Sequence, residues 1–227
     1  MLSKRFNACT YVYLHDDTGR IAKVGAVAPG LGVALQHLTD RAAECFGAEQ
    51  CQPRHVAQAL WACAKLGLAP AHLLRAVLHT GALMQPSWFK AQEVSMAVWA
   101  VGKLSLPDAD GAASGFVARL LPSALARPRE FDPQGLANMI SGVASVGVPA
   151  GSRAVAKLVS SLRGRLQELN PQEVANSLHG LAKLGARLDD CQGIASEVQV
   201  AIRERLPQYT PQQVNIAKSQ LVVQCIR

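Results

Sequence analysis

Residues 56–67 read VAQALWACAKLG, and this phrase returns three times along the chain in altered form. The second copy is VSMAVWAVGKLS (94–105), the third is LANMISGVASVG (136–147) and the fourth is VANSLHGLAKLG (174–185). The copies thus begin at residues 56, 94, 136 and 174. A nearly even spacing of roughly 40 residues is typical of proteins that stack a repeated supersecondary unit. The phrase therefore decides the fold class.

The copies carry signals that begin and end an α-helix. A proline stands three residues before three of the copies and before a further partial copy near the C-terminus. Three of these four prolines follow a residue of a type that caps helix N-termini, namely Asp132, Asn170 and Thr210. Glycine closes three copies, with Ser105 at the same place in the second. Glycine there suits the left-handed conformation in which helices commonly end. Each phrase is thus predicted to be one helix.

The stretch between successive phrases has room for a second helix, and the candidates are residues 71–83, 111–125, 152–166 and 190–206. Residues 31–46 resemble such a second helix without its first partner. We therefore predict an all-α, right-handed α-solenoid of about four helical-hairpin repeats, each of roughly 38–42 residues. The predicted organisation is a partial unit at 29–50, units that start near 51, 89, 131 and 169, and a partial unit at 209–227.

The N-terminal segment, residues 1–28, does not fit the repeat. Residues 11–14 and 21–24 read as a possible β-hairpin. We expect this segment to cap the array or to be disordered. The first six residues faintly resemble an organelle presequence, which Asp16 and Asp17 interrupt, so a complete targeting peptide is not expected.

Composition narrows the class of partner. Apolar residues make up 49% of the chain and aromatic residues only 5%, which suits closely packed helices. Lys and Arg exceed Asp and Glu by 23 to 16, which favours a polyanionic partner, with a basic but inert surface as the alternative. The six cysteines form no C-x-x-C pair, so a reducing compartment and no zinc site are expected. No apolar run is long enough for a membrane span.

One stripe of the phrase is chemically suited to RNA. The stripe consists of three positions of the phrase, spaced i, i+4 and i+7, which therefore share one helix face. The first position is mostly an amide, and the third is lysine in three copies. The second position is always small: Ala62, Ala100, Gly142 and Gly180. An amide can address the edge of an unpaired base, a small residue leaves room for the ligand, and a lysine neutralises a phosphate. The predicted base contacts are Gln58, Met96, Asn138 and Asn176, and the predicted phosphate contacts are Lys65, Lys103 and Lys183. The alternative is a solvated face whose lysines complement the helix dipole.

A second basic feature recurs near the ends of the second helices as the pairs Arg127/Arg129, Arg163/Arg165 and Arg203/Arg205, spaced close to the repeat period. Stacked units would turn these pairs into a ladder of phosphate contacts. Compensation of helix dipoles is the alternative. Trp61, Trp99 and His179 occupy matched positions. We expect repeat packing to bury the tryptophans and the histidine to be hydrogen-bonded at an interface; the alternatives are tryptophans that stack on a ligand and a functional histidine.

No catalytic motif is present. The chain has no glycine-rich phosphate loop, no H-E-x-x-H and no nucleophile elbow, and its acidic residues read as turn and cap residues. We expect neither an enzyme nor a bound cofactor or metal.

The pattern A-N-x-x-x-G-x-A-K-L-G at 175–185, with L-W-A-C-A-K-L-G at 60–67, resembles octotricopeptide-type repeats, the relatives of helical repeats in RAP-domain proteins, FAST-kinase-domain proteins and RNA-editing substrate-binding complex subunits. The resemblance covers about residues 51–225. It implies a single-stranded RNA-binding protein of the mitochondrion or plastid, the mitochondrion being preferred, that acts in RNA processing, stability, editing or translation, with other RNA-processing proteins as further partners. Ser105 departs from the pattern, the third copy lacks both Trp and Lys, and no RAP-like domain is recognised after the repeats, so nuclease activity is not implied. A protein-protein scaffold and a truncated remnant are the alternatives.

Overall fold

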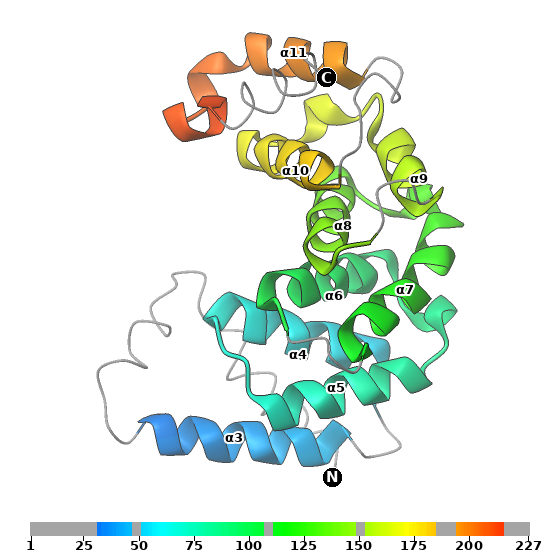
Figure 1. The fold of residues 1–227 in the computed structure, drawn as a ribbon, viewed down its shortest axis with the longest axis vertical. Coiled ribbons are helices and arrows are strands. Elements are labelled where there is room, and N and C mark those ends of the chain that lie inside the picture. The colour runs from blue at the N-terminus through cyan, green and yellow to red at the C-terminus, as the bar shows by residue number, and fades with distance from the viewer. Residues whose placement is uncertain (1–30, 47–50, 107–110, 149–152, 185–193, 216–227) are drawn as a thin grey trace. The chain divides into compact units, whose positions relative to one another are not determined.

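The computed structural model describes residues 31–46, 51–106, 111–148, 153–184 and 194–215 (Figure 1). These residues are helical or lie in turns, and none of them forms a β-strand. The all-α expectation is therefore confirmed for this part of the chain. The hairpin expected within residues 1–28, and the end of the last partial unit from residue 216, lie outside the described residues.

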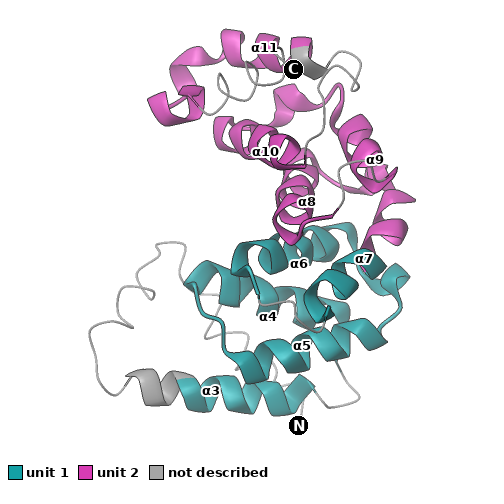
Figure 2. Ribbon diagram, viewed as in Figure 1, with its two compact units in different colours: residues 1–119 teal, residues 120–227 magenta. Residues whose placement is uncertain are grey.

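The chain divides into two compact units, Met1–Arg119 and Leu120–Arg227 (Figure 2). The first contains α3 (Leu31–Phe46), α4 (Pro53–Leu66), α5 (Ala71–Leu83), the short 3₁₀ helix η1 (Pro86–Trp88) and α6 (Ala91–Leu104). The division falls within α7 (Ala112–Leu125). The second contains η2 (Pro128–Glu130), α8 (Pro133–Val146), α9 (Arg153–Leu162), η3 (Leu166–Glu168), α10 (Pro171–Lys183), α11 (Ile194–Glu204) and η5 (Leu206–Gln208).

The helices that carry the repeated phrase are α4, α6, α8 and α10, and within each unit they are neighbours. α4 packs against α6 in the first unit, and α8 packs against α10 in the second. A second helix follows the phrase helix in each case, as the order of the labelled helices in Figure 1 shows, and a 3₁₀ turn follows that second helix. The alternation of phrase helix and second helix was predictable; the 3₁₀ turns were not expected.

The predicted caps open the phrase helices of the second unit. The Asp132 carboxylate accepts a hydrogen bond from the Gly135 amide at 2.6 Å. The Asn170 side chain accepts from the Glu173 amide, and the Glu173 carboxylate accepts in return from the Asn170 amide, both at 2.9 Å. These bonds satisfy amides that the first turn of a helix leaves without a partner. The cap predictions at both positions are confirmed.

Three of the phrase helices, α4, α6 and α8, end in the left-handed conformation that the sequence indicates. Gly67 has φ +65° and Gly147 has φ +84°. Ser105 takes φ +47°, although a residue with a Cβ resists this region. Gly185, predicted to close the fourth copy, lies outside the described residues.

The bounds of the second helices agree with prediction for α3 and α5, and α7 begins one residue later than predicted. The expectation of a single helix over 152–166 was wrong, because α9 ends at Leu162 and Gly164 takes φ +76°, which breaks the helix before η3. Similarly, α11 ends at Glu204, before the predicted residue 206.

Candidate nucleic-acid interface

A solvent-accessible stripe runs along each phrase helix, at positions spaced i, i+4, i+7 and i+11. Every side chain at these positions is half-buried or exposed. We call these positions the helix stripe: Arg54, Gln58, Trp61 and Lys65 in α4; Gln92, Met96, Trp99 and Lys103 in α6; Gln134, Asn138, Ser141 and Ser145 in α8; Gln172, Asn176, His179 and Lys183 in α10. The predicted base and lysine contacts therefore share one accessible face on α4, α6 and α10, and the predicted base contact Asn138 lies on the same face of α8.

In the first unit the stripe carries a cluster of cation and aromatic side chains. The Lys65 Nζ lies 5.4 Å from the centroid of the Trp61 ring and 5.6 Å from that of Trp99. Both distances are within the range of a cation–π interaction. Trp61 comes from the same helix as Lys65 and Trp99 from the neighbouring phrase helix, so the ammonium group joins the two helices. The expectation that repeat packing buries these tryptophans was wrong, because both are only half-buried on the stripe.

In the second unit the stripe carries a chain of amides. Gln172 Nε2 donates to Asn176 Oδ1 at 2.9 Å, and Gln172 Oε1 accepts from Gln213 Nε2 at 2.9 Å. Asn176 is exposed and Asn138 is half-buried on the adjacent helix. Primary amides offer both donors and acceptors, which is what the edge of an unpaired base requires. The bonds among these amides restrict the rotamers of Gln172 and Asn176 and so orient their remaining polar groups.

The small residues that were expected to lie beside the base contacts, one in each phrase helix, have a different role from the one predicted. Ala62, Ala100, Gly142 and Gly180 are all buried. A Cβ added at Gly180 would lie 3.0 Å from Ile140 Cγ2 and 3.2 Å from the Ile140 carbonyl oxygen. The small residue therefore allows α10 to approach α8, and the expectation that it leaves room for a ligand was wrong.

His179 replaces tryptophan on α10. Its side chain is exposed and forms no hydrogen bond with any described residue, so this part of the chain does not supply the expected interface bond. An exposed imidazole is itself a ring on which a base can stack.

Acidic side chains are absent from the helix stripe. The four phrase helices contain only two, Glu93 and Glu173, and both carboxylates accept a backbone amide at the start of their own helix, from Lys90 at 2.8 Å and Asn170 at 2.9 Å. The stripe thus presents Arg54, Lys65, Lys103 and Lys183 without a carboxylate among its positions. Such a face attracts polyanions.

The arginine pairs separate into two structural classes. One class stands immediately before a 3₁₀ helix and consists of Arg127, Arg165 and Arg205. Arg127 is the first member of its predicted pair, whereas Arg165 and Arg205 are the second members of theirs. Arg165 Nη1 donates to the Phe131 carbonyl at 2.8 Å. The Arg205 guanidinium donates to the carbonyls of Leu169, Gln167 and Leu166.

Arg127 is also held close to its own segment. Its Nε donates to the Ser123 carbonyl at 3.3 Å, and its Nη1 pairs with Glu130 at 3.2 Å. The other members, Arg129, Arg163 and Arg203, have exposed side chains. Arg163 faces Glu197 at 3.7 Å. The pairs predicted as one ladder therefore include three arginines that bind the protein itself.

Metal-ligand clusters, a cysteine thiol and helix length bear on other kinds of function. No group of three His, Cys, Asp or Glu side chains that could hold a metal ion occurs among the described residues. Burial raises the pKa of the Cys63 thiol to about 11, so the buried thiol is protonated at neutral pH. Within the part of the chain that the structure describes, no helix is long and apolar enough to cross a bilayer.

Comparisons with known proteins add no relative to this picture. No protein-family model matches the chain, and none of the curated proteins is significantly similar to it.

Proposed function

We propose that the chain binds single-stranded RNA along the helix stripe, and that its helical pairs form a right-handed α-solenoid of about four repeats. The observation that carries this proposal is the Lys65 ammonium near the rings of both Trp61 and Trp99. Stacking rings beside a cation, on a stripe without carboxylates, form the combination that holds unpaired nucleotides without strict sequence preference.

The two units offer different chemistry to the RNA. The tryptophans of the first unit suit stacking on any base, while the amides of the second unit, Asn138 and Asn176, suit hydrogen bonds to base edges. We therefore propose that bases are stacked by the first unit and selected by the second. The protein is proposed to bind and present a transcript without performing a reaction on it.

The place of action rests on the sequence resemblance alone. Octotricopeptide-type repeats act on organellar transcripts, so we propose a role in RNA processing, stability, editing or translation in the mitochondrion or a plastid. Other RNA-processing proteins are the proposed partners of such a complex.

The test is a salt titration of binding to a randomised pool of single-stranded RNA. Replacing Lys65 and Lys103 with alanine should lower affinity and reduce the slope of log affinity against log salt by about 0.7 for each phosphate that the variant no longer neutralises. The matched control is Arg75→Ala with Lys90→Ala, which removes two exposed cations of the same unit that lie off the stripe. Equal effects of the two double variants would contradict a contact specific to the stripe.

The stacking contribution has its own variants. Trp61→Leu and Trp99→Leu should each lower affinity about tenfold, because stacking of one base contributes about 1–3 kcal/mol, and should leave the salt slope unchanged. Trp88→Leu is the control, because the Trp88 side chain is 61% exposed and lies in η1, off the stripe. Asn138→Ala and Asn176→Ala should change which sequences are enriched in the bound pool.

A protein-binding scaffold is the second candidate function. It is favoured by two large apolar side chains at the end of α5 and in η1, Leu83 and Trp88, which are 74% and 61% exposed. Exposed apolar residues that lie close in sequence suit a protein partner. Failure of the wild-type chain to bind any RNA at low salt would overturn the RNA proposal and leave this candidate.

A further inference from the structure

A basic cleft lies in the second unit, between the segment around the α7–η2 junction and the helix α9. Its volume is about 540 Å³. Three cationic side chains line it, Arg129, Lys157 and Arg165, together with the hydroxyl side chains Ser160 and Ser161. No carboxylate is among the described residues that line the cleft. The cleft is separate from the helix stripe, since none of its residues belongs to a phrase helix.

Two of the three cations have no acidic partner among the described residues. Arg129 and Lys157 are exposed, and neither side chain forms an ion pair or hydrogen bond with any residue that the structure describes. Of the nearby carboxylates, Glu130 pairs with Arg127 at 3.2 Å, and Glu168 pairs with Arg165, the third cation of the cleft, at 3.6 Å. Arg129 and Lys157 therefore keep their full charge for a ligand.

The third cation is held in place by the protein. Arg165 donates from Nη1 to the Phe131 carbonyl at 2.8 Å, which fixes the guanidinium at the wall of the cleft. The Ser161 hydroxyl donates its proton to the Lys157 carbonyl at 2.7 Å, so Ser160 is the lining serine whose hydroxyl can donate to a ligand. A partly preorganised site loses less entropy when it orders a ligand.

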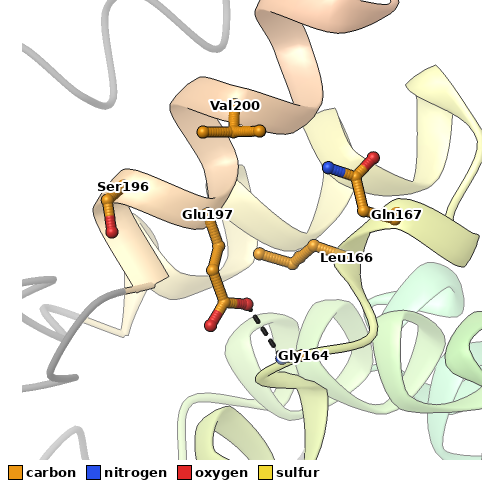
Figure 3. A pocket seen from close by; sticks show the side chains of 6 residues that line it. All are labelled: Gly164, Leu166, Gln167, Ser196, Glu197 and Val200. Atoms are coloured by element: carbon orange, nitrogen blue, oxygen red, sulfur yellow. Dashed lines mark hydrogen bonds between the residues drawn. The ribbon is translucent and has the colours of Figure 1, made fainter.

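A second cavity in the same unit differs from the basic cleft because an acidic side chain lines it. Its volume is about 250 Å³, and it lies between η3 and α11, where Glu197 accepts the Gly164 amide at 2.8 Å (Figure 3). Leu166 and Val200 line the same space in Figure 3. A carboxylate over an apolar surface repels anions, so this cavity does not suit a phosphate.

We propose that the basic cleft binds a phosphate ester. Two cations without acidic partners in the described structure, an anchored arginine and the Ser160 hydroxyl are groups that can donate to phosphate oxygens. The volume of the cleft falls in the range of sites for small organic ligands, so there is room for a nucleotide and not merely for a free ion. The phosphate belongs either to a nucleotide with a terminal phosphomonoester or to the phosphodiester backbone of an RNA chain. Neither source requires that RNA also bind the helix stripe.

The experiment is isothermal titration of the full chain with three probes. AMP carries a phosphomonoester, adenosine carries none, and an oligoribonucleotide without terminal phosphates carries only phosphodiesters. The test variant is Arg129→Gln with Lys157→Gln. The control variant is Arg153→Gln with Arg203→Gln, which removes two exposed charges of the same unit that belong neither to the lining of the cleft nor to the helix stripe. Thermal unfolding of each variant checks that the fold is kept.

The wild-type chain is expected to bind AMP but not adenosine, and the test variant to bind AMP at least about tenfold more weakly than the control variant, since two charge-assisted bonds are removed. If AMP does not bind, a selective drop of oligoribonucleotide affinity in the test variant assigns the cleft to phosphodiesters and equally supports the proposal. Equal binding of both probes by the test and control variants, or absence of binding by the wild type, would overturn it. Failure of RNA binding on the helix stripe is detected separately, by the Lys65 and Lys103 variant.

Discussion

Gly180 of α10 lies directly against the backbone of Ile140 in α8. A Cβ at Gly180 would be 3.2 Å from the Ile140 carbonyl oxygen and 3.3 Å from its carbonyl carbon. These distances are tighter than about nine in ten real Cβ contacts, and the opposing atoms belong to a helix backbone that cannot rotate away. The contact between these two phrase helices therefore depends on a residue without a side chain.

Gly180→Ala is expected to lower the free energy of unfolding by about 1 kcal/mol. Overpacking of a close contact costs about 1–3 kcal/mol, and the better helix propensity of alanine offsets up to about 1 kcal/mol of it. Gly115→Ala is the matched control, because no heavy atom lies within 4 Å of a Cβ built there. It should raise stability by about 0.5–1 kcal/mol. Urea unfolding measures both, and stabilisation by both substitutions would show that the approach of α10 to α8 is not limiting.

Arg205 and Arg203 belong to one predicted pair but should behave differently. Arg205→Ala is expected to lower the free energy of unfolding by about 1–3 kcal/mol, because the carbonyl of buried Leu169 is then without its charged donor. Arg203→Ala, which removes an exposed side chain, should change stability by less than about 0.5 kcal/mol. Thermal unfolding in parallel provides the comparison. Equal effects of the two substitutions would contradict the structural role of Arg205.

The free energy of unfolding should depend on the protonation of His55. Burial, reinforced by the Arg54 charge, lowers the pKa of His55 below its usual 6.5, and Nδ1 accepts the Gln52 amide at 3.1 Å. The unfolded chain therefore binds this proton more tightly than the folded chain, so the contribution to stability is full above pH 6.5 and is lost as the pH falls below it. His55→Gln keeps an acceptor but does not titrate, and should remove this part of the pH dependence. Chemical denaturation between pH 5 and 8 would measure it, and an unchanged profile in the variant would refute the assignment.

Cys63 should resist alkylation in the folded protein. Its side chain is 1% exposed, and burial raises the pKa of the thiol to about 11, so both access and the reactive thiolate are suppressed. Iodoacetamide labelling read by peptide mass spectrometry is expected to modify Cys63 only when urea is added. Rapid labelling without denaturant would mean that α4 opens frequently.

Local signals in the sequence predicted the helices well. The cap residues Asp132 and Asn170 and the closing Gly67 and Gly147 act through bonds or backbone conformations within a few residues of themselves. Because such effects are local, they can be recognised without knowledge of the neighbouring unit. The bounds of α3 and α5 follow from similar local patterns.

The errors concern contacts between repeats. Trp61 stands between two buried apolar residues, Leu60 and Ala62, so hydrophobicity alone does not show that its ring stays half-buried beside Lys65. Likewise, the spacing of Arg163 and Arg165 does not reveal which of the two reaches the Phe131 carbonyl, because the choice depends on where the preceding helix segment ends. The base contacts predicted for Gln58, Met96, Asn138 and Asn176, and the lysine contacts beside them, stay predictions.

The carbonyl bonds of Arg165 and Arg205 have a consequence for how such a chain can change in length. Arg165 bonds to Phe131, 34 residues earlier, and Arg205 bonds to Leu169, 36 residues earlier. Both separations are slightly shorter than the distance in sequence between the start of the third phrase (136) and the start of the fourth (174). One repeat period is therefore long enough to contain both the donor and the acceptor. An in-frame gene duplication or deletion of one whole period would carry the two together, and would leave every remaining arginine with its carbonyl without any compensating mutation.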